Sequence, residues 1–437
     1  MDAWRFKGDV MFELPKSAKI KSEHLLPWAR GTIAASLTLM LAGVAATPSA
    51  VAQIAPLPPT PGFEQPSGLS FGGFNFYNRI QAGLMATDNI RIDPTEESDL
   101  KKILAINAGA RSDWEKHALA ATVSYVDQKA VDVSDQKSSA LSGTISGRYD
   151  FTDTLNLRLG ALSEASIIGK NDPLQFNGNL NGTTQTDTLE AALGWDDKKY
   201  FVNLLSRYQD VSNDTDIDVT VVSRVQSQDR EEYNLTLEAG QHYSWGKAYI
   251  FGGPIRIRYS GSDFILPEDR DSEGGRAGIG AEFAQGKLSG IVRVIGFAQY
   301  FDAPTIGKVI SGVGTAQLTY KIDDQWGVGA ALQRTFDETN IETSGGLFTN
   351  LAAVSALYRP ADNIYLKLGP TYRFYEIEGT SYEAESFTLD ATAAWQVHDR
   401  VELMFNASAS NQLVNDAFLS NLQYSETSAT VSVVVTF

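Results

Sequence analysis

The feature that most constrains this chain is an alternation of apolar and polar residues that recurs from Phe71 to the last residue. Successive side chains of a β-strand point to opposite faces, so each such segment has one apolar and one polar face. In segment 155–159 the three leucines share one face, while Asn156 and Arg158 share the other. The same division occurs in segments 233–238, 255–259, 387–396, 401–403 and 429–437.

These amphipathic strands need a cover for their apolar faces. A soluble β-protein, which is the alternative, would require a second sheet over each of them. Lipid covers the apolar face of every strand at once when the sheet closes on itself. The pattern therefore predicts an all-β, antiparallel, up-and-down transmembrane β-barrel over residues 71–437.

The connections between the strands alternate strictly in length. Short ones are expected at 113–116, 150–153, 196–199, 245–247, 285–287, 322–325, 359–363 and 397–400. Longer polar stretches lie between them, such as 87–99, 168–183, 210–229, 260–275 and 376–383. Short periplasmic turns and longer extracellular loops are typical of outer-membrane barrels. Eight turns and nine loops predict eighteen strands, with sixteen as the alternative, and place both termini in the periplasm.

Aromatic residues flank the expected short turns, as a girdle at the membrane interface would. They are Trp114, Tyr149, Phe151, Trp195, Tyr200, Phe201, Trp245, Tyr320, Trp326, Tyr358, Tyr365 and Trp395. The last strand ends on Phe437, and this ending resembles the recognition signal of the machinery that assembles outer-membrane barrels. That machinery and outer-membrane lipid are therefore the expected partners.

The N-terminal segment predicts export. A basic residue, Arg30, precedes a short apolar run from about Thr32 to Ala46, and an Ala-Val-Ala sequence ends at Ala52. This arrangement indicates a signal peptide over 1–52 that has an extended n-region and is cleaved after Ala52. An uncleaved inner-membrane anchor and a later start at Met11 are the alternatives. The Pro-rich stretch 53–70 is expected to be an extended periplasmic linker.

Composition excludes several kinds of chemistry. The chain has no cysteine, so disulfides, thiolate metal sites and cysteine nucleophiles are impossible. Its net charge of −17 does not provide the basic surface that nucleic-acid binding requires. No cofactor is expected.

The first strand pair carries Asp88-Asn89-Ile90, then Ser98-Asp99, then Arg111-Ser112-Asp113-Trp114 and His117-Ala118-Leu119. This spacing resembles the family named Putative beta-barrel porin 2, most closely over residues 75–210. The resemblance implies an outer-membrane channel, with an exported polysaccharide as one candidate cargo. Asp88, Asn89 and Asp99 are expected in the first extracellular loop, as turn and loop residues rather than ligands.

Catalysis and metal binding are not expected. The exported part has three histidines, His117, His242 and His398, and all lie at short turns, where they are explained as solvated turn residues. The acidic clusters of the loops are Asp214, Asp216 and Asp218, and Glu268, Asp269 and Asp271, and neither forms a complete calcium-binding motif.

The polar faces would line the interior of the barrel. The basic residues expected to point inward and to set selectivity are Arg158, Arg207, Arg256, Arg258, Arg293, Lys367 and Arg373. Inward acidic residues are Glu190, Glu238, Asp390 and Glu402. Eighteen strands enclose a lumen wide enough for water. The sequence thus predicts a Gram-negative outer-membrane channel for polar solutes or an exported polysaccharide. The alternative is a plugged structural barrel that serves a periplasmic export assembly.

Overall fold

The computed structural model describes residues 68–437 except 91, 93, 95, 134–136, 169–181, 216–228, 261–269, 338–343 and 416–422. The predicted signal peptide and nearly all of the predicted linker lie outside the described residues. No helix in the part of the chain that is described is long and apolar enough to cross a membrane.

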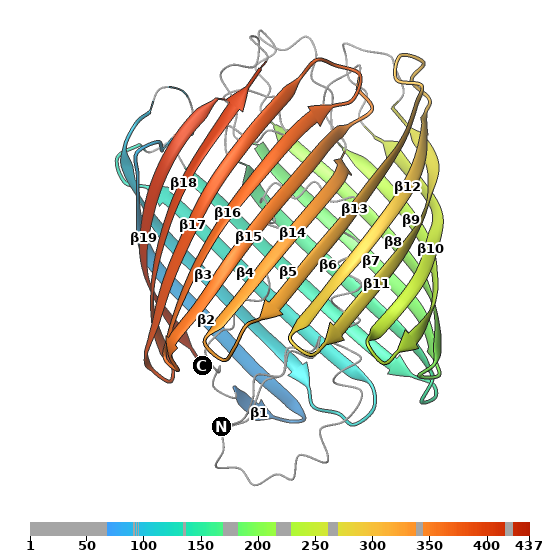
Figure 1. Cartoon of the computed structure of the whole chain (residues 1–437), viewed down its shortest axis with the longest axis horizontal. Helices are drawn as coiled ribbons and strands as arrows, with labels where there is room; N and C mark the ends of the chain where they lie inside the picture. The colour runs from blue at the N-terminus through green and yellow to red at the C-terminus, as the bar shows by residue number, and fades with distance from the viewer. Residues whose placement is uncertain are drawn as a thin grey trace.

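The described residues form a closed antiparallel barrel of eighteen strands, β2 to β19, with a short additional strand, β1 (Figure 1). The strands are β1 (Leu69–Phe71), β2 (Phe74–Thr87), β3 (Asp99–Ser112), β4 (Ala118–Ala130), β5 (Lys137–Asp150), β6 (Leu155–Ile168), β7 (Gly182–Asp196), β8 (Tyr200–Thr215), β9 (Arg230–Tyr243), β10 (Gly246–Tyr259), β11 (Ser272–Gln285), β12 (Leu288–Phe301), β13 (Lys308–Lys321), β14 (Trp326–Asp337), β15 (Leu347–Ala361), β16 (Ile364–Ile377), β17 (Glu383–His398), β18 (Val401–Val414) and β19 (Tyr424–Thr436). The predicted all-β barrel of eighteen strands is confirmed.

Each strand pairs with its neighbours in sequence, and β19 pairs with β2 to close the ring. At this seam the last residue continues the ladder. The Phe437 amide donates to the Asn78 carbonyl at 3.1 Å, and the Asn78 amide donates back at 3.4 Å. β1 pairs with β2 alone, through three residue pairs.

The eight short turns lie at one end of the barrel, together with β1 and the C-terminus (Figure 1). Their positions between the observed strands agree with the predicted ones, and we call this the turn end and the opposite one the loop end. Local hydrogen bonds fix these turns. In the β7–β8 turn the Asp197 carboxylate accepts from the amides of Lys199 at 2.9 Å and Tyr200 at 2.6 Å. These bonds favour the ionised form and lower the pKa of Asp197.

Alternation decides which side chains face outward. In β7, Leu189, Leu193 and Trp195 are exposed, whereas Thr188 and Ala192 are buried. Directly opposite residues of paired strands point to the same side of the sheet. The outward residues of β7 therefore identify the outward residues of β6 and β8. Followed around the ring, the exposed large apolar residues lie on the outer face of every strand. This continuous apolar exterior is the surface that a bilayer covers.

The predicted aromatic girdle is present at the turn end, with two corrections. Trp114, Tyr149, Phe151, Trp195, Tyr200, Tyr320, Trp326 and Trp395 are exposed. Trp326 and Tyr358 stack with ring centroids 4.2 Å apart. Phe201 and Tyr365, however, are only 3% and 5% exposed, because the register turns them to the inner face. Their flanking position was predicted correctly, but the face was wrong.

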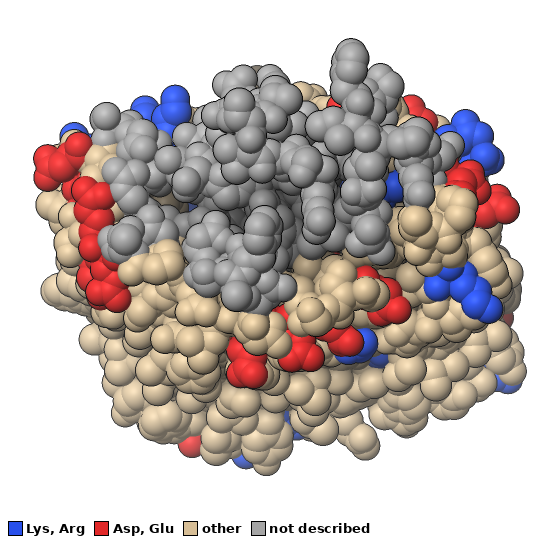
Figure 2. All heavy atoms as spheres, turned by 90° about the horizontal axis from the view of Figure 1, so that it is seen from above, with Lys and Arg blue, Asp and Glu red and all other residues tan. Residues whose placement is uncertain are grey.

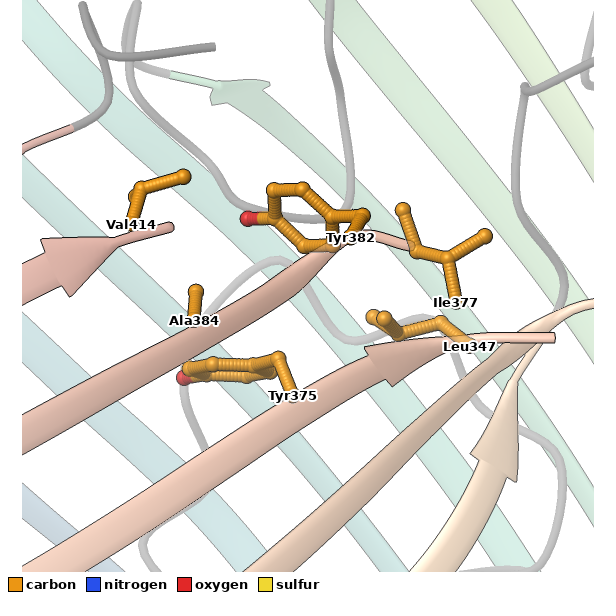
Figure 3. Packing of buried hydrophobic residues seen from close by; sticks show 6 residues of the cluster. All are labelled: Leu347, Tyr375, Ile377, Tyr382, Ala384 and Val414. Carbon is orange, nitrogen blue, oxygen red and sulfur yellow. The ribbon is translucent and has the colours of Figure 1, made fainter. Parts of the chain in front are cut away.

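The barrel has small apolar clusters on its wall instead of one central core. One lies near the loop end of β15 to β18 and comprises Leu347, Tyr375, Ile377, Tyr382, Ala384 and Val414. Figure 3 shows the Tyr382 ring, from the β16–β17 connection, between Ile377 and Val414. This packing fixes the connection against the strands that precede and follow it.

Candidate functional site: the charged inner wall

Five of the seven predicted lumen residues lie on the inner face: Arg158, Arg207, Arg293, Lys367 and Arg373. The four acidic residues Glu190, Glu238, Asp390 and Glu402 lie on it as well. These residues come from strands on different sides of the ring, and only some of them form ion pairs.

Arg256 and Arg258 were assigned to the wrong face. In the register of β10, Arg256 lies opposite Tyr233 and Arg258 opposite Glu231, on the outer side that exposes Ile250. Ile257, only 5% exposed, points inward instead. Apolar residues face lipid only within the apolar band of the membrane. Near the loop end of β10 the apolar residues pack inside the barrel and the arginines lie outside.

The densest network lies on β8 to β12 and centres on Arg293. Its Nε donates to the Tyr249 hydroxyl at 2.6 Å, and its Nη2 lies 3.7 Å from a Glu282 carboxylate oxygen. Lys247 Nζ lies 3.1 Å from the other Glu282 oxygen. The Arg293 side chain is only 5% exposed. Buried charges of this kind require partners, and here one glutamate pairs with two cations.

Arg276 extends this network without an acidic partner. Its Nη2 donates to the Thr236 hydroxyl at 3.0 Å, and no ion pair to Arg276 occurs among the described residues. The Arg276 side chain spans from β11 to β9, past Gly253 on the intervening strand β10. A Cβ at Gly253 would lie 1.9 Å from the Leu235 carbonyl oxygen, so only glycine fits there.

Two further groups line the same half of the ring. Arg207 Nε lies 3.7 Å from Glu190, and its Nη2 donates to Gln209 at 2.8 Å. Nearer the turn end, Arg158 lies directly opposite Arg148 in the ladder. Arg148 pairs with Asp150 at 2.9 Å, whereas Arg158 has no ion pair among the described residues. Among the described residues, Arg276 and Arg158 are thus inner-wall cations without an ion pair, and Arg158 lies nearer the turn end.

The opposite half of the ring is less charged. Lys367 pairs in register with Thr392, and Arg373 with Ser386. Neither cation has an ion pair within 4.0 Å in the part of the chain that the structure describes. Arg79 and Glu402 approach each other to 4.0 Å near the seam. The described inner wall therefore combines a paired and an unpaired set of cations.

Sequence reasoning missed Tyr249, Glu282 and Arg276. The β11 segment is SEGGRAGIGAEF, whose many glycines hide the alternation that would have placed Arg276 and Glu282 inside. Tyr249 is large and apolar, so alternation alone favoured the lipid face, yet it is 4% exposed and bonded to Arg293. Gly280, where a Cβ would lie 2.4 Å from the Tyr249 ring, could have suggested the close packing of such a large inner side chain.

The residues that carried the family resemblance bind the chain's own backbone. The Asp99 carboxylate accepts from the amides of Leu100 at 2.6 Å and Val133 at 2.9 Å. Asn89 is fully buried and donates to the Ser425 carbonyl at 2.9 Å. Asp88 accepts from the Thr427 amide at 2.6 Å. These side chains fix the first loop to its neighbours, in agreement with their predicted role as turn and loop residues.

The three histidines lie at the turn end, as predicted. His117 Nδ1 accepts from the Asp150 amide at 3.1 Å, and the ring stacks on Tyr149. His242 Nε2 lies 3.1 Å from Asp196. His398 Nδ1 accepts from the Arg400 amide at 3.3 Å.

The acidic loop clusters fall largely outside the described residues. Only Asp271 has a described side chain, and it accepts from the Tyr259 amide at 2.7 Å. No group of three metal-ligating residues occurs in the described ranges.

The barrel fold agrees with a comparison of the sequence with known families. The model of the family described as Putative beta-barrel porin 2 matches residues 60–437. The chain belongs to this family. The match covers every strand of the porin barrel, well beyond the 75–210 segment in which the resemblance was strongest. No curated protein matches this porin-family chain.

Solved structures similar to the porin barrel include two Occ proteins and a siderophore receptor. OccK2 (OpdF) of Pseudomonas aeruginosa, in complex with glucuronate, has 8% identity and a TM-score of 0.46, and the match covers 83% of this chain and 98% of that one. OccAB3 of Acinetobacter baumannii has 9% identity and a TM-score of 0.46, with 83% and 99% covered. The siderophore receptor PirA of A. baumannii has 9% identity and a TM-score of 0.42, with 82% and 80% covered.

Proposed function

We propose that this porin-family barrel is a passive channel for polar solutes, with an exported polysaccharide as the specific cargo to test. The loop end faces the cell exterior, and the turn end and both termini face the periplasm. The observation that supports this most directly is the inner wall, where charged side chains line a closed barrel whose exterior is apolar. Such an interior favours water and polar solutes, and its charges select among ions at close range.

Selectivity is expected to depend on Arg276 and not on Arg256. Arg276→Glu changes the inner charge by two units, which at about 8 Å in water corresponds to about 1 kcal/mol, or about a fivefold shift toward cations. Arg276→Gln should produce about half of that free-energy change. Arg256→Glu is the matched control, because it makes the same charge change on the outer face.

The measurement is single-channel conductance of refolded residues 53–437 in a planar bilayer, followed by reversal potentials in a salt gradient. Adding an acidic oligosaccharide to one side tests the polysaccharide cargo through blockade of the open current. A folded barrel without open steps would contradict the channel and would favour a plugged barrel that serves an export assembly. Equal shifts in the Arg276 and Arg256 variants would contradict the assignment of faces.

We also propose that Phe437 is part of the signal read by the barrel assembly machinery. Phe437→Ala keeps the backbone bonds to Asn78, so the purified variant should refold as well as the wild type. In cells, its amount in the outer membrane should fall severalfold. Phe405→Ala, another exposed outer-face aromatic residue, is the control that should assemble normally. If both variants assemble equally well, Phe437 is not a signal.

A further inference from the structure

Three lysines form a row on the outer face of β3, β4 and β5. Lys102 lies directly opposite Lys129, and Lys129 lies directly opposite Lys137. All three are exposed, on strands about 4.8 Å apart. Like charges directly opposite each other destabilise a sheet, so a negative charge beside this row would stabilise the barrel.

Acidic groups among the described residues do not supply that charge in full. On the outer faces of β3, β4 and β5 the only acidic residue is Asp127, which lies 3.2 Å from Lys129. Lys102 and Lys137 have no ion pair among the described residues. The nearby loop acid Asp132 is exposed, and its amide is bonded to Asp99. Among the described residues, the row therefore has one ion pair for three lysines.

The outward arginines near the loop end of β10 are arranged differently. Arg256 lies between Tyr233 and Glu273, and Arg258 lies opposite Glu231. Basic and acidic residues alternate there across neighbouring strands. Charged side chains of both signs also lie around the rim when the barrel is seen from its loop end (Figure 2). In the described part of the barrel, adjacent outward lysines thus form a row on β3 to β5, whereas the outward Lys308 at the loop end of β13 lies opposite Tyr300.

The position of the row indicates its ligand. Leu104, Ile106, Tyr125 and Leu141 lie closer to the turn end on the same outer face, and they would contact lipid tails and the interface. The lysines lie nearer the loop end, within three residues of the ends of their strands, and Leu100 is the exposed apolar residue beyond Lys102 on β3. We expect this level to be that of the lipid headgroups. Lysine ammonium groups beside a membrane bind anionic headgroups through electrostatic attraction. Three adjacent lysines match a headgroup that bears more than one phosphate.

We propose that Lys102, Lys129 and Lys137 form a binding site for a phosphorylated glycolipid headgroup of the outer leaflet. This site rests on the proposed function in one respect, namely that the loop end faces the cell exterior. It would fix lipid to one sector of the barrel wall, and it does not require an open lumen.

The test uses the full chain, purified in detergent, with two probes: diphosphoryl lipid A and the same lipid with both phosphates removed. Native mass spectrometry reads the bound lipid. We expect the wild type to prefer the phosphorylated form and the Lys102→Gln/Lys129→Gln/Lys137→Gln variant to bind it about tenfold or more weakly. Replacing the same three lysines with arginine should retain binding.

The matched control removes three exposed lysines at the turn end, Lys116, Lys198 and Lys199, and should bind like the wild type. A heat-sensitive shift of mobility on a gel verifies that each variant is folded. Equal binding of both probes by the wild type, or undiminished binding by the glutamine variant, would overturn the proposal. Because conductance is measured separately, a silent barrel that binds the lipid would contradict only the channel.

Discussion

Deletion of residues 424–437 is expected to abolish folding of the barrel. β19 pairs with β18 on one side and with β2 on the other, so its removal leaves two open edges. Each unpaired backbone group in the hydrocarbon core of a membrane costs several kcal/mol, and an open sheet does not persist there. An unheated gel after refolding into vesicles should show no folded band.

The control for this deletion is a chain that begins at Phe74 and therefore lacks β1. β1 pairs with β2 alone, and the ring closes without it. This shorter chain should refold to a barrel with the same heat-sensitive mobility as the full one. A folded band from the chain without β19 would show that the seam observed here is not needed for closure.

Ile145→Arg is expected to lower the free energy of unfolding by about 2–4 kcal/mol, which is the cost of a lipid-facing arginine near the middle of the bilayer. Ile145 lies in the middle of β5 and is 53% exposed on the outer face. Its neighbour Ser146 is exposed on the inner face. Ser146 pairs with Ala120, which has only a methyl group, and with Gly160, which has no side chain, so both leave room for a larger side chain.

Ser146→Arg is the matched variant, and it should change the free energy by less than about 1 kcal/mol. Both values come from urea titrations of the barrel in vesicles, with tryptophan fluorescence as the signal. Similar losses in the two variants would contradict a polar, hydrated interior at this level. A loss only in Ile145→Arg would support both the outer lipid face and the lumen of the proposed channel.

The sequence alone was sufficient for the fold class, the strand number and the eight turns. Each of these depends on local patterns, because alternation marks a strand and a short polar connection marks a tight turn. The family resemblance, drawn from residues such as Asn89 and Asp99, was confirmed by a match over residues 60–437. Five of the seven predicted inner cations also followed from alternation within single strands.

Only the tertiary structure decided how the charges are partnered and, in places, which face they occupy. Arg256 and Phe201 show that the rule of apolar side chains outside fails near the barrel ends, where the membrane no longer imposes it. Arg276 reaches Thr236 across Gly253, and Lys102, Lys129 and Lys137 come into one row, through the register between strands. Register depends on the pairing of residues far apart in the chain. The alternation within a strand determines two faces, but closure of the ring determines which face is inside and which side chains meet there.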